Sequence, residues 1–161
     1  MGITKQVALK HNAYFVGQVA DIEVKNTVSK VNATQAVIPF GVAVAFDGEE
    51  GIKAVTTSTT SAQLCGITVR EYQNVTLPSQ EFGVNPQATA TVLTMGAIAV
   101  VAGADVQAGD AVYVGLGADV AGKFTKVAGS GATLAVALTG AKFRHNAKAG
   151  EVVVVALNLG A

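Results

Sequence analysis

Short apolar runs separated by tight turns fill the C-terminal part of the chain, residues 93–159. The last run, residues 151–157, reads EVVVVAL and follows Ala-Gly, while residues 123–127 alternate charged or polar with apolar side chains after a glycine. Continuous or alternating runs of β-branched residues, bounded by Gly and Asp, are typical of β-strands. This part of the chain is therefore predicted to consist of strands and turns.

The N-terminal part carries more patterns of the same kind. Residues 21–25 alternate and are predicted as a half-exposed strand, whereas the polar residues 26–33 are predicted as a loop or sheet edge. Residues 42–46, 52–55 and 63–70 are predicted as further strands. Because no long amphipathic helix pattern is found, we expect an all-β, single-domain protein with little helix: a β-sandwich or barrel-like fold of many short strands.

Two parts of the chain share an order of features. In residues 41–69 and again in residues 109–137, a glycine precedes a strand, an acidic turn with glycine, a short strand, a loop of small residues and an apolar strand. Strands rich in Gly and Ala also resemble one another by chance, so the sequence leaves a duplication and a coincidence equally open. We further expect an N-terminal arm or edge segment over residues 1–20, followed by a β-rich domain over residues 21–161.

Composition indicates a chain that buries part of its surface against another protein. At 161 residues it is long enough for one domain with a real core. Half of the residues are hydrophobic but only 6% are aromatic, so Val, Ala, Leu and Ile must supply most of that core. Charged residues make up 14% and the formal net charge is zero, which protects poorly against association. An Ala-rich soluble monomer is the alternative.

The same numbers argue against several classes of partner. Without a basic excess, neutralisation of a phosphate backbone cannot drive binding, so no nucleic acid is expected as a partner. The longest apolar run, residues 95–104, is too short to span a bilayer, so no membrane is expected either. The first residues resemble neither a signal peptide nor a myristoylation signal, since Gln6 stands where Ser or Thr is needed. A single cysteine, Cys65, fits synthesis in a reducing compartment.

No set of residues forms a recognisable catalytic or metal-binding motif. Residues 117–123 match most of a phosphate-binding loop, but Phe124 replaces the required Ser or Thr, and the next residues are predicted as a strand rather than a helix. Cys65 lies in an apolar strand, and His11 and His145 are far apart in the sequence, which leaves too few ligands for a transition metal. We therefore expect no enzyme, no cofactor and no metal, although a site assembled from distant residues is an alternative.

The aromatic and charged residues outside the strand patterns are the best candidates for protein contact. Two of the nine aromatics adjoin near the N-terminus, where they either fill the core or anchor an arm on a neighbour. Residues 70–87 form the longest irregular stretch, and such stretches are usually functional or contact-forming. The candidate interface residues are Tyr14, Phe15, Arg70, Tyr72, Phe82, Arg144 and His145.

The linear order of several motifs resembles that of tailed-bacteriophage capsid decoration proteins, also called head cement proteins. The resemblance spans roughly residues 14–159 and implies no catalytic residues, because these families share no catalytic motif. The motifs that carry it are IPFGVAV at residues 38–44, CGITVRE at 65–71, VQAGDAVY at 106–113, GKFT at 122–125, AKF at 141–143 and AGEVVVV at 149–155.

The resemblance implies a structural virion protein, in which residues 21–161 would be the decoration domain. Such a protein binds the outer surface of an icosahedral phage head and stabilises the head by bridging neighbouring major capsid protein subunits. The resemblance also implies a homo-oligomer, with a trimer favoured over a dimer, and synthesis in the cytoplasm of the host bacterium. Another phage structural β-module, such as a tail tube or fibre subunit, and a carbohydrate- or cell-surface-binding β-sandwich are the alternatives.

Overall fold

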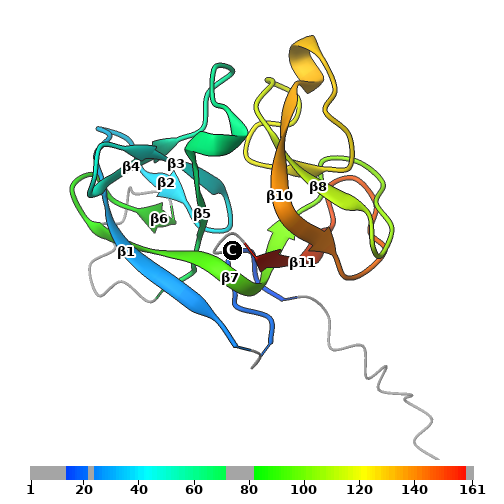
Figure 1. Ribbon diagram of the computed structural model, residues 1–161, viewed down its shortest axis with the longest axis horizontal. Coiled ribbons are helices and arrows are strands. Elements are labelled where there is room, and N and C mark those ends of the chain that lie inside the picture. Colours follow the sequence, from blue (N-terminus) through cyan, green and yellow to red (C-terminus); the bar gives the residue numbers. More distant parts are fainter. Residues whose placement is uncertain (1–13, 22–23, 72–81, 159–161) are drawn as a thin grey trace, which may run out of the picture.

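The protein is built almost entirely from strands (Figure 1). This computed structural model describes residues 14–21, 24–71 and 82–158. The strands in these ranges are β1 (Asn26–Asn32), β2 (Ile38–Pro39), β3 (Ala43–Asp47), β4 (Gly51–Ala54), β5 (Leu64–Thr68), β6 (Gly83–Val84), β7 (Thr89–Val101), β8 (Ala111–Gly115), β9 (Phe124–Thr125), β10 (Ala135–Phe143) and β11 (Val152–Asn158). The helical elements in these ranges are two short 3-10 turns, η1 (Ser61–Gln63) and η2 (Gly131–Thr133). The described ranges contain no helix that is long and apolar enough to cross a membrane.

One long strand, β7, takes part in both halves of the molecule. Nine strands form a sheet in the order β1-β4-β3-β5-β7-β11-β10-β8-β9, and β1 also pairs with β7, which closes the first half into a small barrel. In the second half, β9 returns to the end of β7 through a parallel bridge between Ala102 and Phe124. In Figure 1 the green strand β7 runs along the lower side of the first half and ends beside β11 at the inner edge of the second half. The expected all-β, barrel-like single domain is confirmed.

The two halves repeat one pairing scheme. In the first half β3 pairs with β4 and β5, and in the second β8 pairs with β9 and β10. The turns η1 and η2 lead into β5 and β10 respectively, and the β2–β6 pair corresponds to the bridge between Val106 and Ala147. Gly41 N donates to Thr68 O as Gly109 N donates to Phe143 O, both at 2.8 Å. The order of features in the sequence therefore reflects a real likeness in topology.

Strand β5 and parts of β3 and β7 are buried on both faces, which joins the halves into one domain. Val44 and Cys65 point into the core of the first barrel. Their chain neighbours Ala43 and Leu64 point the other way and pack into the core of the second half. Alternating side chains on a strand face opposite sides, so a strand between two cores must be apolar throughout. The small apolar residues of these strands meet that requirement.

Strand β1 corrects one expectation from the sequence. Residues 26–33 were predicted as a loop or edge because they are polar, yet residues 26–32 form a strand that pairs antiparallel with β7 and parallel with β4. Most of its side chains are exposed or half-exposed, while Asn32 at its end is fully buried. The Asn32 amide donates to Ala36 O at 2.9 Å and to Val84 O at 3.0 Å. Backbone pairing rather than side-chain burial therefore defines most of this strand.

The segment that precedes β1 covers the remaining edge of β7. Gly17 N donates to Ala99 O at 2.7 Å, and Ala20 N donates to Ala97 O at 2.8 Å. Gly17 also lies against Gly41, and both have positive φ, +80° and +72°. A Cβ atom on Gly17 would lie 2.8 Å from Gly41 N, and one on Gly41 would lie 2.5 Å from Gly17 N. Only glycine fits at either position, so this contact holds residues 14–21 against the barrel.

We expect Gly41→Ala to lower the free energy of unfolding by about 3 kcal/mol, because it combines a left-handed backbone with a steric clash. Gly48 is the matched control: its φ is +75° and no atom lies within 4 Å of its Cβ position, so Gly48→Ala should cost only about 1 kcal/mol. Urea denaturation of the three proteins measures both values. Equal losses for the two variants would contradict a tight contact between Gly17 and Gly41.

The thiol of Cys65 should be unreactive in the folded protein. Cys65 is buried in the first core, and burial raises the pKa of its thiol while the charge of Lys30 lowers it by less. At pH 8 a thiol reagent such as DTNB should react about a hundredfold more slowly with the native protein than with the urea-unfolded chain. Equal rates would contradict burial of the thiol.

The same raised pKa predicts the direction of a pH effect on stability. The folded state favours the neutral thiol, so the stability associated with Cys65 is present below the thiol pKa of the unfolded chain, about 8.5. It falls as the pH rises above that value, because the unfolded chain ionises first. Cys65→Ala, which has no thiol, should lack this part of the pH dependence when unfolding is compared at pH 7 and pH 10.

Candidate functional site

Three of the predicted interface residues lie together on the surface. The guanidinium carbon of Arg70 is 4.8 Å from the centre of the Phe15 ring and 4.6 Å from the centre of the Phe82 ring. Both distances are typical of cation–π contact. A shallow depression of about 480 Å³ surrounds them. We call this surface the Arg70 patch, formed by Phe15, Gln18, Val19, Val69, Arg70, Glu71 and Phe82.

Three separate parts of the chain position the Arg70 patch. Phe15 belongs to the segment before β1, Arg70 follows β5, and Phe82 directly precedes β6. Arg70 N donates to Gly17 O at 2.7 Å, which fixes the N-terminal segment beside the end of β5. Phe82 packs edge-to-face on Phe40, with 5.2 Å between ring centres, and Phe40 belongs to the core of the first barrel. The patch is therefore anchored to the fold through backbone and core.

Both rings of the patch remain largely open to solvent. Phe15 is 65% exposed and Phe82 is 51% exposed. An exposed cation–π contact is worth about 0.5–1 kcal/mol, which is less than full burial of a Phe side chain provides. Two large exposed apolar side chains that contact the same guanidinium are typical of a place where another molecule binds.

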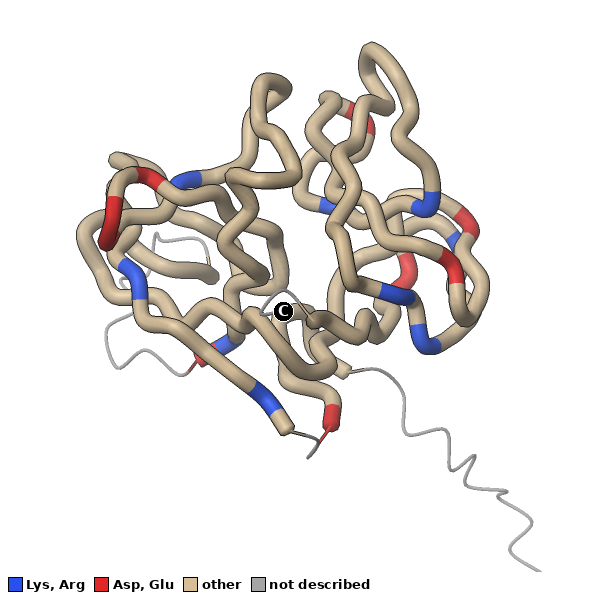
Figure 2. Tube along the Cα trace, viewed as in Figure 1, with Lys and Arg blue, Asp and Glu red and all other residues tan. Residues whose placement is uncertain are grey.

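Charge is sparse around the patch. Figure 2 shows that most of the described trace carries neither basic nor acidic residues. Among the described residues, ion pairs join Lys53 to Asp47 at 3.0 Å and Arg144 to Asp21 at 3.5 Å. Within the described part of the chain, no carboxylate forms an ion pair with Arg70.

The other predicted interface residues lie elsewhere. Tyr14 is next to Phe15 in the chain and is 41% exposed. Arg144 follows β10, and its ion pair with Asp21 connects the second half to the far end of the N-terminal segment. His145 is exposed beside it. Tyr72 lies outside the described residues. The patch thus combines Phe15, Arg70 and Phe82 but not Arg144 or His145.

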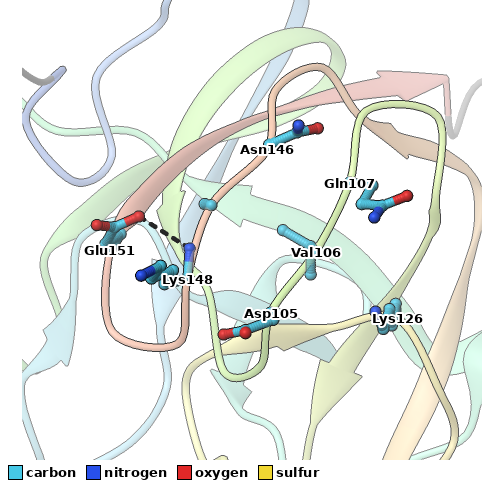
Figure 3. A pocket seen from close by; sticks show the side chains of 8 residues that line it. Asp105, Val106, Gln107, Lys126, Asn146, Lys148 and Glu151 are labelled. Carbon is cyan, nitrogen blue, oxygen red and sulfur yellow. Dashed lines mark hydrogen bonds between the residues drawn. The ribbon is translucent and has the colours of Figure 1, made fainter.

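A second depression, in Figure 3, is a structural junction of two turns. Its acidic side chains accept hydrogen bonds from the backbone: Asp105 accepts from Ala149 N at 3.0 Å and Glu151 from Lys148 N at 2.8 Å. Asn146 accepts from Ala108 N at 2.9 Å in the same way. Among the described residues no group of three His, Cys, Asp or Glu side chains is placed to hold a metal ion. These polar groups join the turns before β8 and β11.

The stretch that resembles a phosphate-binding loop is also structural. Residues 117–122 form turns that lead into β9, so a strand follows the glycine and lysine, as predicted. Gly117 packs directly against the backbone of Ala132, where a Cβ atom would overlap a carbonyl oxygen. Phosphate loops need the free N–H groups of a helix N-terminus, which this arrangement does not supply.

Comparison with solved structures identifies a phage capsid chain of similar fold. A chain of the capsid of Myoviridae phage XM1 is 26% identical, with 98% of each chain covered and a TM-score of 0.69. The N base of head fibre gp8.5 from bacteriophage phi29 is 16% identical, with 83% of this chain and 95% of that chain covered and a TM-score of 0.49. A search of curated proteins gave no significant match.

A family model described as structural cement protein (E217 gp24/Pam3 gp6) matches residues 3–158, nearly the whole chain. The sequence motifs, the barrel-like fold and the likeness to a chain of the XM1 capsid agree with this match. The protein belongs to the phage structural cement protein family.

Proposed function

We propose that this cement protein binds the outer surface of an icosahedral phage head and stabilises it by bridging neighbouring major capsid protein subunits. The protein is synthesised in the cytoplasm of the host bacterium and then added to the shell as a homo-oligomer, with a trimer favoured over a dimer. Its role is structural, and no covalent bond is made or broken. Membership of the cement family supports the association with capsid proteins.

The Arg70 patch is the observation that carries this proposal. Protein interfaces are enriched in aromatic residues and Arg, and a few such side chains supply most of the binding energy. Phe15 and Phe82 offer apolar area that is still exposed, and Arg70 lies against both rings. A neighbour that covers the patch would therefore bury apolar area that the fold leaves exposed.

The composition of the chain suits broad contact with a protein lattice. Burial of a charge without a partner is costly, and this chain has few charged residues to bury. Contacts that are weak one at a time add up when many copies are repeated over a shell, because each copy bound to two neighbours gains from the high effective concentration of the second site. A rigid, barrel-like domain loses little conformational entropy when it binds.

The double variant Phe15→Ala/Phe82→Ala should bind expanded capsids at least about tenfold more weakly than the unchanged protein, since it removes the apolar part of the patch. Binding is measured by cosedimentation with expanded capsids of the cognate phage that lack this protein. Phe46→Ala is the matched control: Phe46 is 44% exposed and lies 5.7 Å from Lys30, away from the patch. It should bind as the unchanged protein does.

Two outcomes would count against the proposal in different ways. If the unchanged protein fails to bind the capsids saturably, the cement function itself is contradicted. If it binds but the double variant and the Phe46 control bind equally well, the function stands and the patch is not the contact surface. Thermal unfolding of each variant establishes that it is folded before binding is measured.

A further inference from the structure

We propose that Arg70 binds a carboxylate of the neighbouring capsid subunit through the free edge of its guanidinium group. This inference rests on the proposed function and names the chemistry that the Arg70 patch recognises. The partner group is an Asp or Glu side chain on the capsid protein, bound at the edge of the guanidinium while the same neighbour covers the exposed rings of Phe15 and Phe82.

The side chain of Arg70 has donors that the described part of the chain does not use. A guanidinium group carries five N–H donors in one plane and has no acceptor. Cation–π contact with Phe15 and Phe82 engages the charge through the rings and consumes none of these donors. Within the described residues, no hydrogen bond or ion pair from the Arg70 side chain is present. A binding partner can therefore occupy the edge of the group.

The rings of the patch restrict the position of the guanidinium before a planar anion binds. Contact with both rings restricts the Arg70 side chain, so less side-chain freedom is lost when a ligand binds. Once a neighbour covers Phe15 and Phe82, water leaves the site and the attraction between opposite charges becomes stronger. Through the edge of its planar guanidinium, Arg can form two parallel hydrogen bonds with a carboxylate, whereas Lys can present only a point charge.

A carboxylate is the anion that fits this protein. Phosphate groups of nucleic acid or lipid are recognised by clusters of basic residues, and the chain has no net positive charge. Glu71 lines the same depression, and it would repel rather than assist an approaching carboxylate. A second copy of this chain could instead pair its own Glu71 with Arg70. The two partners predict opposite effects of removing the Glu71 charge, which makes them distinguishable.

Affinity for expanded cognate capsids tests the proposal with three variants of the full-length protein. Arg70→Lys keeps the charge but loses the planar fork, and we expect it to bind about tenfold more weakly. Glu71→Gln should bind more tightly than the unchanged protein, because it removes a negative charge that repels the capsid carboxylate. Lys126→Gln, which changes an exposed cation far from the patch in the second half, should bind within about twofold of the unchanged protein.

The following results would overturn the inference. If Arg70→Lys binds as tightly as the unchanged protein, the planar recognition of a carboxylate is wrong while the cement function stands. If Glu71→Gln weakens binding and lowers the oligomeric state seen by light scattering, the partner of Arg70 is a second copy. If the unchanged protein does not bind capsids, the proposed function fails, and this inference fails with it.

Cross-linking identifies the partner group directly. Carbodiimide joins an amine to a carboxylate without a spacer, so Arg70→Lys provides an amine at the position of interest. At saturating concentration on capsids, we expect a cross-linked peptide that joins position 70 to an Asp or Glu of the major capsid protein. A cross-link from position 70 to Glu71 of a second copy, or none at position 70 while other lysines react with the capsid protein, would overturn the inference.

Discussion

The architecture depends on the use of both edges of β7. Along its first part, β7 pairs with β1 on one edge and with β5 on the other; along its last part, it pairs with β11 and with the segment before β1. An open strand edge invites uncontrolled association, so each edge must be covered. The segment at residues 17–20 is the piece that covers the last free edge. Its position brings Phe15 to Arg70 and so creates the patch.

Glycine makes the passage of β7 between the halves possible. Gly96 has a φ of +122° and lies where the pairing partner on one edge changes from β1 to the N-terminal segment, and a Cβ atom there would lie 3.1 Å from the Cβ of Lys25. Glycine inside a strand often marks a bend or a close approach of backbones. The same principle acts at Gly17 and Gly41, where two chain segments meet without side chains. Close backbone packing, rather than large aromatic side chains, therefore holds these parts together.

The sequence predicted the fold class well because strand signals are local. Period-two patterns and glycine turns identified most strands, and the apolar setting of Cys65 correctly indicated a buried thiol. The sequence patterns did not identify β1, because its side chains are mostly polar and the strand is defined by backbone pairing with β7. Phe15, Arg70 and Phe82 could each be selected as unusual residues. Their meeting could not be predicted, because it depends on long-range contacts such as the bond from Arg70 N to Gly17 O.

Under the proposed function, the position of the Arg70 patch would link partner binding to the stability of the fold. Phe15 belongs to the segment that covers β7, while Arg70 and Phe82 belong to the first barrel. A neighbour that contacts all three therefore holds the segment against the barrel. A ligand that binds only the folded arrangement stabilises it by mass action, and the gain grows with occupancy. In the proposed capsid contact, one interaction would stabilise both the capsid lattice and the fold of the bound cement protein. This is the physical advantage of an interface that spans the contact between the N-terminal segment and the first barrel.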